Sequence, residues 1–430
     1  MRHEFDIEEG TEVVFALGDG LVDVSTAALV DGFESTRRFW IDWSARSTYA
    51  GRWGTVVERS ALALKLLTHR PSGGLIAAGT TSLPETIGGE RNWDYRYVWI
   101  RDAAFALYAF MELGYTEEAE AFTGWLQRRL DECATADSND RQPLRPLYDI
   151  DGNAELEEIE LDHWAGYADS SPVRIGNAAS EQLQLDIYGE IIDSLYLADK
   201  HGPGLSLDAW NGVRHLADWV CEHWDQPDDG FWEVRNGPHD FTAARLLCWV
   251  ALERAMRMAR FRGRPADLER WGRSRDAIHA CIVERGWSDE LGAFTQTLDG
   301  DRLDASILLM PLVRFISSHD PRWTSTLEAI GRTLTHDVLV ERYEDGTDGL
   351  EGDEGTFTIC TFWYVEALAR AGQVERARLM FDKVLSYAGP LGLFSETISD
   401  SGDQLGNFPQ AFTHLSLISA AVAIDEAEGR

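Results

Sequence analysis

The run from Gly88 to Asp102 combines residue types that suit the binding of a polyhydroxylated molecule. Its glycine pair permits a turn, four interleaved aromatic side chains offer flat faces, and Arg101 beside Asp102 forms a rigid polar fork. The helix-favouring segment 103–107 follows at once, so these polar residues are expected at a helix N-terminus. An isolated Arg–Asp pair more often braces a loop. The interleaved aromatic residues instead favour a ligand site, and a sugar matches both the flat faces and the hydroxyl-binding groups.

Two glutamates stand in contexts that could orient a carboxyl group, although among 73 acidic residues any single one is by default a solvated surface charge. Glu233 follows Phe231 and Trp232 in a glycine-flanked loop, and these apolar neighbours would favour its protonated form. Glu396 lies in a more polar loop before the last expected helix, which suits an ionised carboxylate. A protonated and an ionised carboxyl, about 6.5–9.5 Å apart across an anomeric carbon, are the acid and base of inverting glycoside hydrolysis.

Composition narrows the classes of partner. The chain has 430 residues and a formal net charge of −34, which would repel nucleic acid phosphates and an anionic membrane surface. Neutral sugars are indifferent to this charge. Hydrophobic residues make up 44% of the chain, enough for a packed core, and the length allows one large domain or two to three average ones.

Cysteine usage and the absence of targeting signals favour a cytoplasmic protein. The five cysteines form no C-x-x-C pair and predict free thiols in a reducing compartment; they are Cys133, Cys221, Cys248, Cys281 and Cys360. No secretion signal and no apolar run of membrane-spanning length is visible in the sequence. His163, His239 and His414 lack metal-ligand spacing, and no glycine-rich phosphate loop occurs, so no cofactor is expected.

Apolar residues at helical spacing dominate the chain from Ser25 onward. They predict helices over 29–43, 55–68, 101–113, 117–131, 180–200, 206–224, 241–259, 265–284, 303–317, 324–336, 357–371, 373–387 and 408–427. Short and long connections alternate, which suggests helical hairpins closed into a ring and an all-α fold. Residues 134–179 read mostly as loop, too long for an idle connection, and are expected to be functional.

The run Gly88–Leu107 and several later segments resemble the inverting glucoamylases and trehalases of glycoside hydrolase family 15. The resemblance extends from about residue 33 to the C-terminus. It implies an (α/α)6 barrel and an exo-acting α-glucoside hydrolase that releases β-glucose from the non-reducing end. The substrate would be a short glucoside, with trehalose, isomaltose and malto-oligosaccharides all open. Glu233 would be the general acid and Glu396 the general base.

The same resemblance implies roles around the two glutamates. Arg101 and Asp102 would hydrogen-bond the hydroxyls of the terminal glucose, and Trp99 would line the pocket beside its ring. Tyr95 would hydrogen-bond the base or its water. Trp232 lies at the centre of the general-acid loop.

Two further segments match the family less specifically. Arg342 resembles a second glucose-gripping arginine. Glu354 resembles a loop residue of the bacterial enzymes, but an acid favoured by a helix dipole explains it equally well. The runs 161–167 and 171–177 resemble segments that line the sugar pocket, and Arg174 among them could equally be a loop brace.

The chain departs from the family at two places. Bacterial members carry a β-sandwich before the barrel, whereas residues 2–17 here predict only two short strands with a turn at Glu9–Gly10. We therefore expect a β remnant and linker over 1–28, a catalytic domain over 29–430, and an open strand edge that rests on the barrel or pairs in a homodimer. Fungal members also hold a second glutamate after the acid, where Val234 stands here, which weakens the case for maltose-type substrates.

Two other classes of protein share some of these features. A disaccharide phosphorylase on the same kind of barrel would use phosphate in place of water, but it needs no base, so Glu396 disfavours it. A catalytically silent sugar-binding protein would need neither glutamate.

Overall fold

The computed structural model of the chain describes residues 4–11, 13, 15, 25–135, 142–202, 204–344, 346, 348–350 and 354–429. The chain divides into two compact units, residues 1–47 and 48–430. Whether the predicted domain boundary at residues 28 and 29 holds stays a prediction. Among the described helices, none is both long and apolar enough to cross a membrane.

The first unit contains one helix, α1 (Thr26–Ser44), in its described residues. Ser25 caps it, because its hydroxyl accepts a hydrogen bond from the Ala28 amide at 3.3 Å. The turn predicted at Glu9–Gly10 is present. The strands predicted on either side are not formed by residues 4–8, 11, 13 and 15, whose side chains are exposed where described. Without a neighbouring chain segment, a strand here has no hydrogen-bond partner. Residues 2, 3, 12, 14, 16 and 17 lie outside the described ranges.

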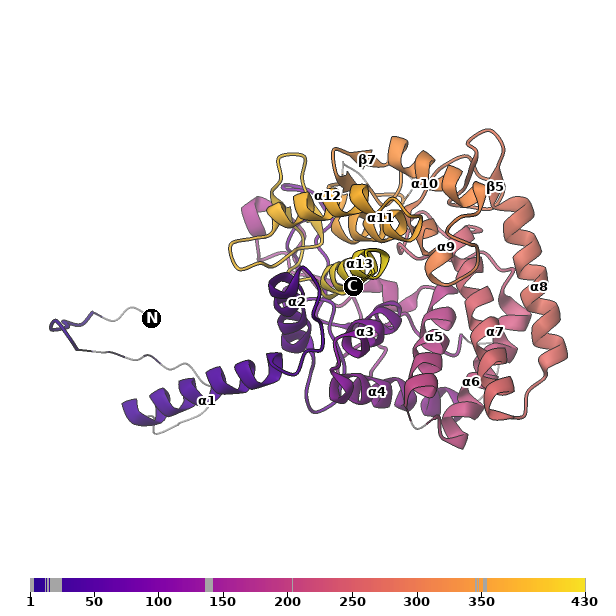
Figure 1. Cartoon of the computed structure of the whole chain (residues 1–430). Helices are drawn as coiled ribbons and strands as arrows, with labels where there is room; N and C mark the ends of the chain where they lie inside the picture. The colour runs from indigo at the N-terminus through magenta and orange to yellow at the C-terminus, as the bar shows by residue number, and fades with distance from the viewer. Residues whose placement is uncertain are drawn as a thin grey trace. The chain divides into compact units, whose positions relative to one another are not determined.

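In its described residues the second unit holds twelve helices (Figure 1). They are α2 (Gly54–Leu67), α3 (Arg101–Glu112), α4 (Thr116–Thr135), α5 (Asp186–His201), α6 (Leu207–His223), α7 (Thr242–Arg262), α8 (Leu268–Arg285), α9 (Leu309–Leu312), α10 (Pro321–Thr333), α11 (Thr358–Arg370), α12 (Val374–Val384) and α13 (Ala411–Ala427). The predicted helices agree with these within a few residues, except at the start of α5, which begins at Asp186 and not at residue 180, and at 303–317. There the chain forms a 3-10 turn, η3 (Ala305–Leu308), and only the short α9.

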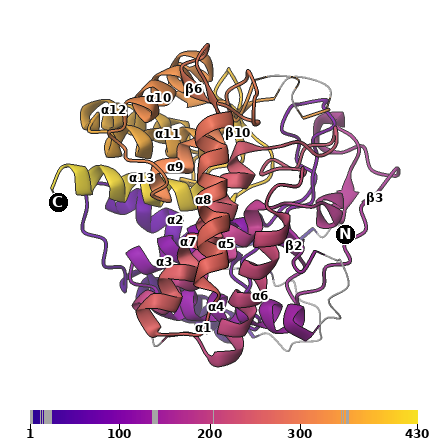
Figure 2. The ribbon, with the colours of Figure 1, turned by 90° about the vertical axis from the view of Figure 1, so that its right-hand side faces the viewer.

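Six of these segments form a closed inner ring. Helix α3 contacts α5, α5 contacts α7, α7 contacts η3, η3 contacts α11, α11 contacts α13, and α13 contacts α3 again. The short α9 continues η3, the other helices of this unit cover the ring from outside, and Figure 2 shows α8 lying over α7. This is the predicted (α/α)6 barrel.

Side-chain patterns explain which helices are inside. The inner helix α11 is buried from Thr358 to Ala369, so it needs no polar face. The outer helix α8 buries only Trp271, Ile278 and Ile282, which recur on one face at helical spacing. A helix with apolar side chains on every face is shielded from water only inside the ring. A helix with one apolar face can bury that face against the ring and expose its polar face outside.

Short antiparallel strand pairs hold the loops in place. β1 (Val98–Trp99) pairs with β2 (Leu147–Tyr148), and β10 (Thr397–Ile398) lies between β9 (Thr356–Phe357) and β11 (Gln404–Leu405). The other pairs are β3 (Ile159–Glu160) with β4 (Arg174–Ile175), β5 (Trp287–Ser288) with β6 (Ala293–Phe294), and β7 (Thr335–His336) with β8 (Leu339–Val340). The loop 142–185 thus carries three strands, together with the 3-10 turns η1 (Tyr167–Asp169) and η2 (Ala178–Glu181).

The close approach of α5 to α7 at Gly189 gives a stability prediction. A Cβ atom on Gly189 of α5 would lie 2.3 Å from the Leu247 carbonyl oxygen of α7, so Gly189→Ala must force the two helices apart. We expect it to lower the free energy of unfolding by about 1–3 kcal/mol. Gly124→Ala is the matched control: its nearest neighbour would be Arg128 Nη1 at 3.8 Å, and it should gain about 0.5–1 kcal/mol from helix propensity. Urea unfolding of both variants measures the difference, and equal stabilities would contradict the prediction.

Candidate active site

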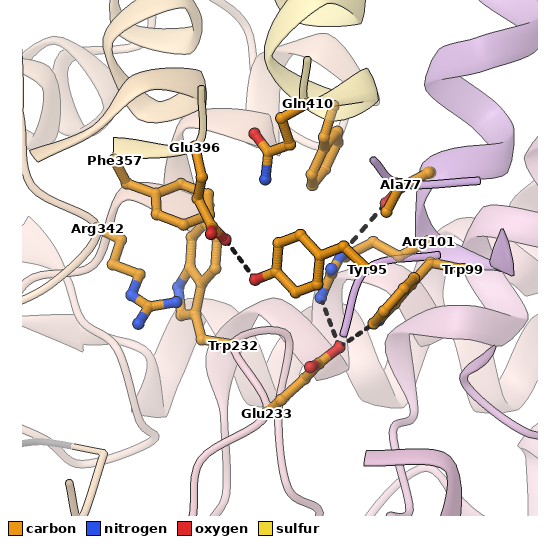
Figure 3. A pocket seen from close by; sticks show the side chains of 12 residues that line it. Ala77, Tyr95, Trp99, Arg101, Trp232, Glu233, Arg342, Phe357, Glu396 and Gln410 are labelled. Atoms are coloured by element: carbon orange, nitrogen blue, oxygen red, sulfur yellow. Dashed lines mark hydrogen bonds and ion pairs between the residues drawn. The ribbon is translucent and has the colours of Figure 1, made fainter. Parts of the chain in front are cut away.

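One pocket opens at the end of the barrel where the inner helices begin (Figure 3). Arg101 is the first residue of α3, Phe357 is the N-cap of α11, and Gln410 is the N-cap of α13. The pocket is lined by Ala77, Tyr95, Trp99, Arg101, Asp102, Trp232, Glu233, Arg342, Phe357, Glu396, Gln410 and Phe412. Both predicted catalytic glutamates and six of the seven predicted binding residues therefore meet in one place, although they are spread over most of the sequence.

Glu233 projects into the pocket from a tight turn before α7. Its backbone has φ of 62°, a conformation that is strained for a residue with a Cβ and that clusters at functional sites. Two donors hold its carboxyl: Trp99 Nε1 lies 2.7 Å from Oε1, and Arg101 Nη1 lies 3.2 Å from the same oxygen. Arg101 Nη1 also donates to the Phe231 carbonyl at 2.6 Å, so one guanidinium fixes both the loop and its glutamate.

The aromatic residues before Glu233 anchor its loop. Trp232 Nε1 donates to Asp304 Oδ1 at 2.9 Å, and Asp304 is buried at the N-cap of η3. The Phe231 ring packs edge-on against Trp363, with 5.8 Å between centroids. The groups that hydrogen-bond the Glu233 carboxyl are thus the polar donors Trp99 and Arg101, while Phe231 and Trp232 anchor the loop that carries it.

Glu396 is more deeply buried, with 1% of its surface exposed. Tyr95 donates its hydroxyl to Oε1, and the Glu396 carbonyl accepts from the Thr358 amide at 2.9 Å at the start of α11. Burial raises the pKa of Glu396 well above its ordinary value, the Glu85 carboxyl raises it further, and the Tyr95 hydrogen bond opposes the shift.

The rings of Tyr95 and Trp99 link the two glutamates. They meet edge to face with centroids 5.4 Å apart, and each binds a different glutamate (Figure 3). Since both rings belong to one short run ending in β1, that run sets the positions of both carboxyl groups at once.

Arg101 and Asp102 leave polar atoms for a ligand. Within the described residues, Arg101 Nε and Asp102 Oδ1 are buried without a hydrogen-bond partner, although the two lie only 3.7 Å apart. Burial raises the pKa of Asp102 to about 6, with the Arg101 charge opposing the shift. Hydroxyl groups can both donate and accept, so they match this donor and acceptor pair.

Arg342 reaches the pocket from the segment before α11. Its Nε lies 2.7 Å from Glu354 Oε1, and its Nη2 lies 3.8 Å from Glu85 Oε2. Glu354, predicted to bind substrate, is not part of the pocket lining and instead holds Arg342 in place.

The long loop supports the site more than it lines it. Arg174 Nη1 donates to the Glu90 carbonyl at 2.8 Å, and its guanidinium stacks on Trp93 at 4.6 Å, so it is a loop brace. His163, Trp164 and Tyr167 line a separate, more open groove with residues 81–83.

Sequence reasoning missed four lining residues and one buried neighbour. Phe357, Gln410 and Phe412 lie in segments whose resemblance was recognised, but their side chains were given no role. Ala77 and Glu85 bound the small-residue loop before the aromatic run. The only available signal was their position beside recognised segments. Among the described residues, no cluster of metal-binding side chains occurs.

Comparison with known proteins identifies the family of this chain. The model of glycosyl hydrolases family 15 matches residues 51–422. The chain belongs to this family. It is 45% identical over 402 residues to a trehalase of Mycobacterium tuberculosis, covering 93% of this chain and 58% of the relative. A trehalase of Thermoplasma acidophilum is 39% identical over 396 residues, with 92% and 66% covered. The chain thus spans about three fifths of the length of these relatives.

Solved structures support the fold. A wild-type glycosidase superposes with a TM-score of 0.67 at 18% identity, covering 86% of this chain and 96% of that one. A bacterial glucoamylase complexed with acarbose gives a TM-score of 0.66 at 17% identity, with 86% and 55% covered.

The Tyr95 hydroxyl gives a pH prediction. Because its hydrogen bond lowers the pKa of Glu396, Tyr95→Phe should raise that pKa, and the general base predicted at Glu396 would be active only when ionised. We expect the acidic limb of kcat/KM to move to higher pH, measured on any glucoside the protein cleaves. Tyr97→Phe is the control, since Tyr97 lies in the same run but does not line the pocket. A limb that moves to lower pH in Tyr95→Phe would contradict this assignment.

Proposed function

We propose that this protein hydrolyses α,α-trehalose into two glucose molecules with inversion at the attacked carbon. The observation that carries the proposal is the placement of two differently held glutamates in one pocket, beside Arg101 Nε and Asp102 Oδ1, which have no hydrogen-bond partner within the described residues. The similarity to trehalases over nine tenths of the chain supports the choice of substrate.

The acid step falls to Glu233. Its carboxyl gives a proton to the oxygen that links the two glucose units while the bond from that oxygen to the anomeric carbon breaks. Arg101 and Trp99 fix the carboxyl through Oε1, so the other oxygen is the one available to carry and deliver the proton. Arg101 and Asp102 hold hydroxyls of the glucose whose bond is broken.

The base step falls to Glu396. Its carboxylate accepts a proton from water as the water oxygen bonds to the anomeric carbon from the face opposite the leaving oxygen. The Tyr95 hydroxyl keeps one carboxylate oxygen occupied, which leaves Oε2, buried and without a partner in the described residues, for the water. The products are one β-glucose and one α-glucose.

The pocket favours a short substrate. Only twelve of the described residues line the pocket, among them Trp99 of β1 and Phe357 of β9, and a pocket this small suits exo attack on one terminal sugar. Val234, directly after the acid, is 2% exposed and does not line the pocket, so it offers no polar contact to a second glucose.

Stereochemistry and the two glutamates test the mechanism. Proton NMR during early turnover of trehalose should show equal amounts of α- and β-glucose, whereas retention would give only α-glucose.

Glu233→Gln should lose roughly 10²–10⁴-fold of kcat on trehalose but far less on α-glucosyl fluoride, whose leaving group needs no proton. Glu396→Gln should lose activity on both substrates. A Glu233→Gln variant with near-normal turnover of trehalose would exclude Glu233 as the acid.

A substrate series tests the specificity. We expect kcat/KM to be highest for trehalose, lower for isomaltose and maltose, and lowest for soluble starch. The contact missing at Val234 corresponds to about 1–3 kcal/mol of discrimination, enough to change the preferred disaccharide. An efficiency that rises steadily from maltose through maltoheptaose to starch would indicate a glucoamylase instead.

A further inference from the structure

One buried carboxyl group beside the pocket has no role in this mechanism. Glu85 precedes the aromatic run, and only 1% of its surface is exposed. Its amide donates to the Arg91 carbonyl at 3.2 Å, and its own carbonyl accepts from the Thr397 hydroxyl at 3.4 Å. Glu85 is therefore clamped between the aromatic run and the residue that follows Glu396.

The side chains of Glu85 and Glu396 meet at Gly406. A Cβ atom on Gly406 would lie 3.0 Å from Glu396 Oε2 and 3.7 Å from Glu85 Cγ. The Gly406 backbone has φ of 78° and its amide donates to the Pro84 carbonyl at 2.7 Å. Glycine thus allows both the turn and the close approach of the two side chains.

The charges around this pair do not balance. The charged and titratable groups that face it are Tyr95 and Arg91 from the aromatic run, and Arg342, Asp348 and Glu354 from the segment before α11. Two arginines therefore face four carboxyl groups, counting the pair itself. Within the described residues, Oε2 of Glu85 and Oε2 of Glu396 are both buried and accept no hydrogen bond.

Burial raises the pKa of Glu85 to about 7, with the Arg342 charge opposing the shift and Glu354 adding to it. Each of the two neighbouring carboxyls disfavours ionisation of the other, so their protons leave in two linked steps. Arg342 Nη2, 3.8 Å from Glu85 Oε2, favours placing the first negative charge on Glu85.

We propose that Glu85 is a positioning residue for the reaction: its carboxylate, buried beside Glu396 and held by Arg342, makes Glu396 a stronger base. The inference rests on the proposed hydrolysis. The proton still passes from water to Glu396, and Glu85 forms and breaks no bond. A base with higher proton affinity stabilises the transition state in which the water proton is moving.

Glu85→Gln tests this by removing the charge at nearly constant size. We expect the acidic limb of kcat/KM to move to lower pH by about one unit, because a like charge next to Glu396 is lost. At the pH optimum, kcat should fall roughly three- to tenfold while KM changes little. Glu85→Asp restores the charge and should return the limb toward that of the wild type. A limb in Glu85→Gln that coincides with the wild-type limb would overturn the proposal.

Glu366→Gln is the matched control. Glu366 is also a buried carboxyl, paired with Arg370 at 2.7 Å, but it lies two turns along α11 from the Glu396 contact at Thr358. The substitution Glu366→Gln also removes a buried charge, but it does so far from the proposed base. Its pH profile should match the wild-type profile, and a shift equal to that of Glu85→Gln would show a general effect of destabilisation and overturn the proposal.

Failure of the proposed function would appear differently, as wild-type protein that releases no glucose from any substrate.

The free energy of unfolding tests the Glu85–Glu396 pair without an activity assay. Since the folded-state pKa values are raised, wild-type stability should fall as pH rises, and Glu85→Gln should flatten this fall between about pH 4.5 and 7. Urea unfolding across that range measures both slopes. Equal slopes in the two proteins would overturn the proposal without any assay of activity.

Discussion

The structure depends on keeping several carboxyl groups out of water at one end of a helical ring. Glu85, Asp102, Asp186 and Glu396 are each at most 3% exposed, and an isolated buried charge is too costly to persist unpaired. Two guanidinium groups supply opposite charge: Arg101 lies beside Glu233, the proposed acid, and Arg342 lies on the side of Glu396, the proposed base. Arg101 contacts the carboxyl groups of Asp102 and Glu233. Arg342 contacts those of Glu85 and Glu354, so changing either arginine disturbs two carboxyl groups at once.

The helix ring supplies a second source of favourable charge. The pocket lies where α3, α7, α11 and α13 begin, and the first turn of a helix presents unpaired N–H groups with partial positive charge. Thr358 uses one of these amides to hold the Glu396 carbonyl. A ring whose inner helices all start at one end therefore offers an anion-tolerant surface there, and the chemistry that needs carboxylates is placed on it.

Much of the fold could be predicted from the sequence because the barrel is built from local patterns. From residue 55 onward the apolar spacing indicates nearly every helix. It failed at 303–317, where the buried run around Leu308–Leu309 is apolar enough to read as helix. There Asp304, which caps η3 and binds Trp232, holds the chain in a tight turn instead. The N-terminal strands failed for a different reason, since alternation alone does not provide a partner strand.

The site was predicted only as far as its segments could be recognised. Tyr95 and Glu396 are 301 positions apart, and their hydrogen bond was expected only because both segments resemble the family, since neither segment by itself encodes that the two side chains meet. The same holds for Glu85, whose significance depends on Gly406 and Arg342 lying beside it. The two glutamates proposed as acid and base show why such contacts matter more than residue type. Glu233 is held by an arginine and an indole N–H at a strained turn, whereas Glu396 has one hydroxyl donor and an acidic neighbour. Identical side chains can therefore serve as acid and base, because the segments that reach them from elsewhere in the chain make their surroundings different.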